Sequence, residues 1–199
     1  MPLDVEKLPP AVRELLAWEH PPALDAGNSN ESARAKLAAL QPADIAPDRK
    51  LADRKMAECC LSGLWLRLDF LHESHELSQE IHTASGSFWH AIMHRREPDY
   101  PNSKYWLRQT GDHPAFAAIH NAAKAEFSRK PAGATDPTRA FAPLEIQSLI
   151  AAPKWDPYRF VDLCQQACRG KDRELEQACK TLQRIEWQVL FEHCYERCV

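Results

Sequence analysis

The sequence predicts an all-α fold, a single-domain helical bundle or bundle-like array, and two observations carry this prediction. Fifteen prolines stand against six glycines, which is typical of helices that begin at proline and not of a turn-rich sheet. No stretch shows the sustained alternation of β-branched residues that marks a half-buried strand. With 199 residues, 44% of them hydrophobic, the chain has the size and apolar content of one domain with a core.

The helices are expected where apolar periodicity follows a proline or a capping residue. Pro10 and Pro114 each precede a helical pattern, and Asp156 is placed to cap a third. The expected helices cover residues 10–18, 31–40, 47–82, 85–96, 115–127, 157–169 and 172–199.

The domain organisation follows from these patterns. Residues 1–46 are expected to form an N-terminal helical appendage, and residues 47–199 the main bundle. Two long proline-rich connections are predicted within the bundle, at 97–113 and 128–155.

Charge and hydropathy exclude two classes of partner. A formal charge of -3 gives no basic footprint for nucleic acid. No apolar run approaches the roughly 18 to 20 residues that cross a bilayer, so no membrane partner is expected. The N-terminus carries two acids and lacks the basic start and apolar stretch of a signal peptide. The expected location is therefore cytoplasmic.

The seven cysteines are interpreted as structural residues. Cys164 and Cys168, like Cys194 and Cys198, stand four residues apart in helical segments and share a helix face. They are expected to be small buried hydrophobes, because the paired CxxC knuckles of a thiolate zinc site are missing.

Histidines occupy positions where an amphipathic helix normally carries hydrocarbon. Advancing about 100° per residue gives the helix at 47–82 an apolar stripe made of Cys60, Leu61, Leu64, Trp65, Leu68 and Leu71. The same stripe continues through His72, His75, Gln79 and His82. A buried polar group without a partner costs about 1–3 kcal/mol, so these side chains are expected to bind one another, water, a metal ion or a ligand.

The next helix and the last one repeat this pattern. His90 and His94 share a face with small residues, which indicates close approach to another element or a lined cavity. In the C-terminal helix, Glu186 and His193 fall in the centre of the apolar stripe. The three helices are therefore predicted to enclose a polar pocket.

Metal binding is the first hypothesis for this pocket. His90 and His94 have the i, i+4 spacing that lets two imidazoles of one helix reach one metal ion. The third ligand is expected from a neighbouring helix, as in other bundle metal sites. The candidates are His75, which is the first choice, His82, Glu76 and Glu186. Three protein ligands and an open position would let a divalent metal activate water for hydrolysis. The candidate catalytic residues, as general acids or bases, are Glu76, Glu186 and His193.

Cationic and aromatic side chains follow His94 directly and suit a small anionic or polyhydroxylated substrate. The candidate substrate-binding residues are His72, Arg95, Arg96, Lys104, Tyr105 and Trp106. A simpler interpretation of Arg95 and Arg96 is favourable placement at the negative end of a helix dipole.

Three functions therefore stay open from the sequence. The first is a metal-dependent, hydrolase-like enzyme, the second a module that binds a small ligand without turnover. The third is a structural or interaction protein whose histidines only satisfy each other. His20, His113 and His120 are interpreted as ordinary structural histidines.

The block FWHAIMHRREPDYPNSKYW, at 88–106, resembles one in a family of uncharacterised bacterial and fungal proteins. The resemblance extends to WDPYRFVDLC at 155–164 and to IEWQVLF at 185–191. It implies no activity, cofactor or partner.

Overall fold

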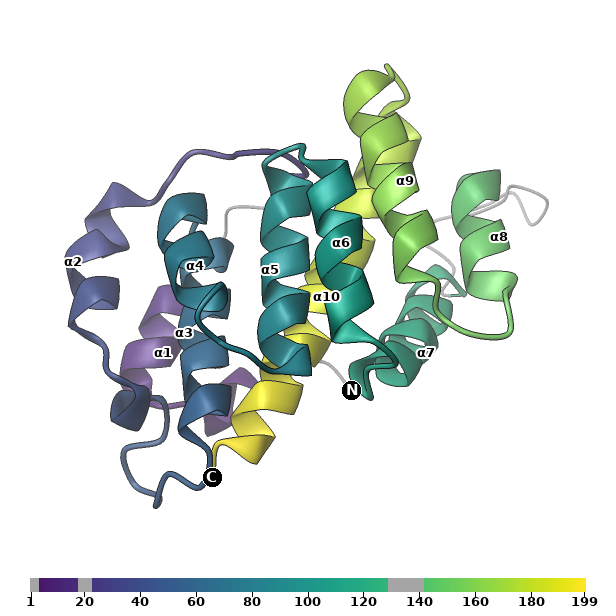
Figure 1. Cartoon of the computed structure of the whole chain (residues 1–199). Coiled ribbons are helices and arrows are strands. Elements are labelled where there is room, and N and C mark those ends of the chain that lie inside the picture. Colours follow the sequence, from purple (N-terminus) through teal and green to yellow (C-terminus); the bar gives the residue numbers. More distant parts are fainter. Residues whose placement is uncertain (1–3, 18–22, 129–141) are drawn as a thin grey trace.

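The computed structural model describes residues 4–17, 23–128 and 142–199, and every regular element among them is helical (Figure 1). The predicted all-α, bundle-like fold is thereby confirmed for this part of the chain. The elements are η1 (Val5–Lys7), α1 (Pro10–Leu16), α2 (Glu31–Ala39), η2 (Pro42–Ile45), α3 (Arg54–Arg67), α4 (Leu71–Ser78), α5 (Ala84–Arg96), α6 (Tyr100–Thr110), α7 (Ala115–Phe127), α8 (Leu144–Ala151), α9 (Pro157–Arg169) and α10 (Arg173–Arg197).

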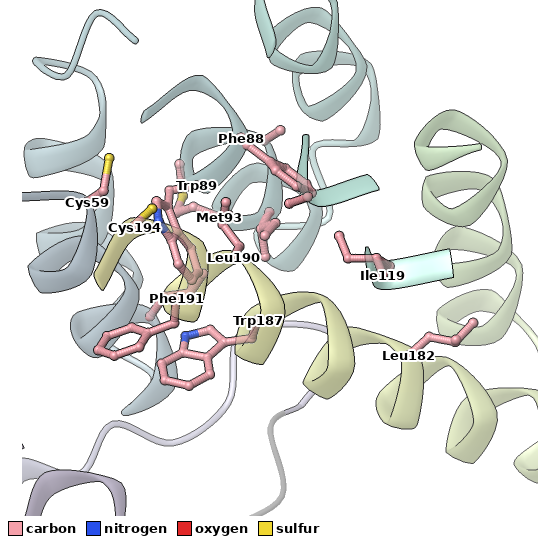
Figure 2. Packing of buried hydrophobic residues seen from close by; sticks show 14 of the residues in the cluster. Cys59, Phe88, Trp89, Met93, Ile119, Leu182, Trp187, Leu190, Phe191 and Cys194 are labelled. Carbon is pink, nitrogen blue, oxygen red and sulfur yellow. The ribbon is translucent and has the colours of Figure 1, made fainter. Parts of the chain in front are cut away.

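Helix α10 is the long central element, and it packs against α3, α7 and α9. Large aromatic side chains fill the space between α10 and α5 (Figure 2). The ring of Trp89 meets that of Trp187 edge to face at 6.1 Å, and Trp187 stacks on Phe191 at 4.8 Å. These three side chains are at most 8% exposed, so burial of their large apolar surface stabilises the packing of the bundle.

The prediction of a single helix at 47–82 is wrong, because the chain forms two helices, α3 and α4, with a break between them. Asp69 adopts a left-handed backbone conformation, with φ of 63°. Its carboxylate accepts from Arg96, which also donates to the carbonyl oxygen of Leu66 at 2.7 Å. The break lets α4 fold back on α3, where Ser62 Oγ lies 3.1 Å from Ser74 Oγ.

The predicted connection at 97–113 also differs, because it contains α6. Asp99 caps this helix by accepting from the backbone amide of Asn102 at 3.3 Å. Pro101 lies in the first turn, where no intrahelical partner for its missing N–H is required. Residues 129–141 of the other predicted connection, at 128–155, lie outside the described part. The rest of that connection contains a helix that was not predicted, α8.

The N-terminal elements share the core of the main bundle. Val12 of α1, Leu37 of α2 and Ile45 of η2 are at most 1% exposed and belong to the same hydrophobic cluster as α5 and α10. Among the described helices, none combines the length and apolarity needed to cross a bilayer.

All seven cysteines are free thiols, and six are buried. The interpretation as small buried hydrophobes is confirmed for Cys164, Cys194 and Cys198. It is wrong for Cys168, which is exposed near the C-terminal end of α9.

Candidate metal centre

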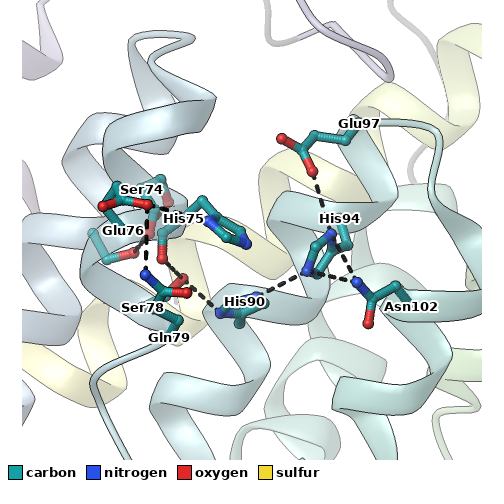
Figure 3. A network of polar contacts seen from close by, with 10 residues as sticks. Ser74, His75, Glu76, Ser78, Gln79, His90, His94, Glu97 and Asn102 are labelled. Carbon is teal, nitrogen blue, oxygen red and sulfur yellow. Dashed lines mark hydrogen bonds and ion pairs between the residues drawn. The ribbon is translucent and has the colours of Figure 1, made fainter.

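Three histidines from two helices converge on one point (Figure 3). His90 and His94 lie one turn apart on α5, and the fold-back of α4 brings His75 opposite them. One ring nitrogen from each lies within 4.8 Å of the other two. Within the described residues, this is the only group of three or more His, Cys, Asp or Glu side chains with such spacing.

The two histidines of α5 are in direct contact. His90 Nε2 lies 2.8 Å from His94 Nε2, and the ring of His75 is 4.8 Å from His90 and 5.3 Å from His94. His90 and His94 are 1% and 5% exposed, whereas 30% of the His75 side chain reaches solvent. The cluster is therefore accessible from the His75 side.

A second layer of side chains fixes the two buried rings. Ser78 Oγ lies 3.1 Å from His90 Nδ1, and Glu97 Oε2 lies 3.3 Å from His94 Nδ1. Asn102 of α6 places its Nδ2 3.1 Å from His94 Nε2. The ring of Trp106 stacks on His90 at 4.1 Å. Since Ser78 and Glu97 occupy the Nδ1 atoms, the Nε2 atoms are left to face each other.

The buried imidazoles are uncharged at neutral pH. Burial, together with the positive charge that His94 and His75 would carry, lowers the pKa of His90 to about 3. Burial also lowers the pKa of His94, although Glu97 opposes this effect. Neutral imidazoles carry the free lone pair that a metal ion requires.

The polar side chains at the mouth of the cluster are mostly acidic. Glu76 Oε1 lies 3.8 Å from His75 Nδ1, and 59% of the Glu76 side chain is exposed. Glu97 and Asp99 oppose the lowering of the His94 pKa by their negative charge. Such surroundings favour a bound cation.

The neighbouring arginines, predicted to bind substrate, lie apart from the histidine cluster. Arg95 donates to Glu186 Oε2 at 2.5 Å, and Arg96 is bound by Asp69. Both guanidinium groups are at most 3% exposed. Their charges are thus neutralised inside the protein.

The other sequence-predicted residues divide between the cluster and the surface. Trp106 belongs to the cluster, as described, and Lys104 pairs with Asp162 at 2.5 Å. Tyr105 is 46% exposed, and His72 faces solvent on α4. His193 lies with its ring 4.7 Å from His113, in a separate pair.

His113 also lies 3.0 Å from the hydroxyl oxygen of Ser85, but this contact is structural. The backbone amide of Ala115 donates to His113 Nδ1 at 3.1 Å. A neutral ring then carries its hydrogen on Nε2 and donates to Ser85, so it does not act as a base toward the hydroxyl. His120 likewise bonds a backbone carbonyl, that of Ile150, at 3.0 Å, as expected for a structural histidine. His20 lies outside the described residues.

Sequence reasoning missed Ser78, Glu97 and Asn102. Glu97 follows His94 by three residues, which is the i, i+3 spacing of neighbours on a helix face. Extending the predicted helix at 85–96 by one residue would therefore have placed Glu97 beside His94. Asn102 was hidden because the segment that carries it was predicted as a connection and not as α6.

Comparison with known proteins identifies no relative: no family model, curated protein or solved structure is significantly similar to this chain. The chemistry of the histidine cluster is therefore the basis for assigning a function.

Proposed function

We propose that His75, His90 and His94 bind one divalent transition metal ion, with zinc expected, and that this centre hydrolyses a small neutral or polyhydroxylated substrate. The observation that carries the proposal is the convergence of three imidazole nitrogens within 4.8 Å. Three protein ligands with a fourth position open are typical of hydrolytic zinc sites, and imidazole is among the ligands that zinc prefers.

The nitrogen spacing suits such an ion. Two ligands at the usual distance from tetrahedral zinc lie about 3.3 Å apart, and His90 Nε2 and His94 Nε2 are 2.8 Å apart. At this distance the two Nε2 atoms cannot both carry a hydrogen. At least one of them therefore already points a lone pair at the other ring. A widening of about 0.5 Å, by side-chain rotation, gives the spacing of co-ligands.

The outer residues have defined roles in this proposal. Glu97 and Ser78 hold the rings of His94 and His90 through Nδ1, as carboxylates and hydroxyls commonly do for ligating histidines. When bound, the metal would polarise a water or a substrate oxygen for hydrolysis. The Asn102 amide, 3.1 Å from His94 Nε2, is placed to donate to an oxygen there.

The charges around the cluster favour a neutral substrate. Glu76 and Glu97 flank the ligands, whereas Arg95 and Arg96 are each paired with a buried carboxylate. Of the two substrate classes that the sequence suggested, the polyhydroxylated one therefore suits the site better than the anionic one.

Metal analysis tests the proposal. The untagged chain, purified without chelator, should contain one equivalent of zinc by mass spectrometry, and His90→Ala and His94→Ala should each lose it. His72→Gln, an exposed histidine of α4, is the matched control and should retain it. Retention of metal by His94→Ala would refute the site.

Turnover is tested separately on a panel of neutral esters, amides and glycosides. Hydrolysis should require zinc and should vanish in His94→Ala. Stoichiometric zinc without hydrolysis of any panel member would instead favour the non-catalytic binding module.

A further inference from the structure

Four of the seven cysteines gather where α3 packs against α10. The thiol of Cys59 is hydrogen-bonded to that of Cys194, and the thiol of Cys60 to that of Cys198. Figure 2 shows Cys59 and Cys194 on either side of this interface. All four side chains are 0% exposed. Two pairs of thiols therefore bridge the same two helices.

The backbone holds Cys60 and Cys198 close to each other. The carbonyl oxygen of Cys198 accepts from the backbone amide of Ala52 at 2.8 Å, just before α3 begins. The thiol of Cys60 lies 4.0 Å from the carbonyl oxygen of Phe191. The thiol of Cys198 lies 3.1 Å from the carbonyl oxygen of Tyr195, one turn further along α10. A disulfide between the two cysteines would thus replace a contact that the fold already makes.

Cys198 is the more nucleophilic thiol of this pair. The hydrogen bond with Cys60 lowers the pKa of Cys198, and the charge of Arg49 lowers it further, although burial opposes both effects. Burial raises the pKa of Cys60 well above its usual value. The thiolate is the form that attacks an oxidant, so Cys198 reacts first. Cys198 directly follows the last residue of α10, and helix ends open more readily than helix interiors, which gives a small oxidant access.

We propose that Cys198 and Cys60 form a reversible disulfide when the protein meets hydrogen peroxide. The Cys198 thiolate attacks one peroxide oxygen, and the O–O bond breaks to give a sulfenic acid and a hydroxide, which takes a proton and becomes water. The sulfur of Cys60 then attacks the sulfur of Cys198, and the S–O bond breaks as the S–S bond forms. The hydroxyl group leaves with the proton of Cys60 as a second water. Two thiols thus lose two electrons, and one peroxide gains them.

The disulfide joins the end of α10 covalently to α3. Because Cys60 and Cys198 are far apart in the sequence, the crosslink restricts the unfolded chain and raises the midpoint of urea unfolding. A thiol reductant reverses the reaction by exchange. The proposal is independent of metal binding at the histidine cluster.

Peptide mapping of the full chain tests the pairing. The protein is treated with equimolar hydrogen peroxide in EDTA, alkylated and cleaved with trypsin, which cuts after Lys55, Arg67, Arg184 and Arg197. The peptide at 56–67 should be joined to the dipeptide at 198–199, with a mass two hydrogens below their sum, and dithiothreitol should separate them. A link from 56–67 to 185–197, which carries Cys194, or no link at all would overturn the proposal.

Three variants identify the two sulfur atoms and their order of reaction. Cys60→Ser should lose the link and leave Cys198 as a sulfenic acid that dimedone labels, whereas Cys198→Ser should lose the link and leave Cys60 unlabelled. Cys59→Ser, which changes the neighbouring buried thiol, is the matched control and should keep the link. Survival of the link in Cys60→Ser, or its loss in a folded Cys59→Ser, would refute the assignment. If a variant does not fold, fragment spectra of the wild-type peptide decide, because they separate Cys59 from Cys60.

Discussion

Arg95 Nη2 donates to Glu186 Oε2 at 2.5 Å across the interface of α5 and α10, and both side chains are at most 3% exposed. The guanidinium also lies 4.6 Å from the ring centre of Phe160. Glu186 Oε1 and Arg95 Nε have no hydrogen-bond partner among the described residues. The pair is thus almost completely desolvated, and each charge depends on the other.

Removing one partner of this pair should be costly. Glu186→Met leaves the Arg95 charge buried and is expected to lower the free energy of unfolding by about 3–5 kcal/mol. Arg95→Met/Glu186→Met should lose much less than the sum of the single variants, because no unpaired charge remains. Urea unfolding measures all three. The exposed pair of Arg184 and Glu126 is the control, where Arg184→Ala should cost about 0–1 kcal/mol; additive losses at the buried pair would contradict its strong coupling.

Gly63 is expected to be intolerant of any side chain. A Cβ atom at this position would lie 2.8 Å from Cζ2 of Trp89, which is fully buried. The carbonyl of Gly63 also accepts from Trp187 Nε1 at 2.8 Å, which limits movement of α3. Gly63→Ala should therefore cost about 1–3 kcal/mol by overpacking. In a Trp89→Leu background the same change should cost less, and an unchanged cost would show that Trp89 is not the obstacle.

The pair of His113 and His193 should make the protein acid-sensitive. Burial lowers the pKa of both rings to about 4, helped by His193 for His113 and by Arg197 for His193. In the unfolded chain these groups titrate near 6.5. Between about pH 6.5 and pH 4 the unfolded state therefore binds more protons, and the free energy of unfolding falls as pH falls.

Urea unfolding between pH 7 and pH 4, in EDTA, measures this effect. His113→Asn/His193→Gln should lose less stability over this range than the wild type, because neither replacement side chain titrates. The asparagine amide oxygen introduced by His113→Asn can still accept from the backbone amide of Ala115. His72→Gln, on the surface of α4, should follow the wild-type profile. Parallel profiles for wild type and the double variant would show that neither ring titrates abnormally.

Local sequence signals were sufficient to predict most of the helices. Pro10, Pro114 and Asp156 marked helix starts that the structure bears out, because a proline or a capping side chain acts within its own first turn. The break at Asp69 carries no such signal. It depends on Arg96, 27 residues further along the chain, and a contact of this range is not visible in local periodicity.

The same distinction applies to the histidine cluster. His90 and His94 come together through the helical repeat alone, so the sequence predicted their contact. His75 reaches them only because α4 folds back on α3. The sequence prediction placed His75 near His90 and His94 correctly, but it relied on an unbroken helix that the structure does not have. Glu186 stands in an apolar stripe, as expected, but its partner is Arg95, a pairing that only tertiary packing reveals.

Glu97 should control the strength of metal binding without contacting the ion. Its carboxylate lies 3.3 Å from His94 Nδ1, and a carboxylate in this position orients the ring and raises its basicity. Glu97→Gln keeps the shape but removes the charge. It is expected to weaken zinc binding about 10- to 100-fold, measured by competition with a chromogenic chelator.

The effect of Glu97→Gln should be confined to the metal. Because 39% of the Glu97 side chain is exposed, its loss should change the free energy of unfolding of the metal-free protein by no more than about 0.5 kcal/mol. Glu80→Gln, an exposed acid just after α4, controls for general charge and should leave zinc affinity close to wild type. If both variants weaken zinc equally, the long-range field of the surface is responsible. If neither variant weakens zinc binding, the contact between Glu97 and His94 has no role in it. A histidine that is oriented and polarised through Nδ1 must bind zinc less tightly when the Glu97 carboxylate loses its charge.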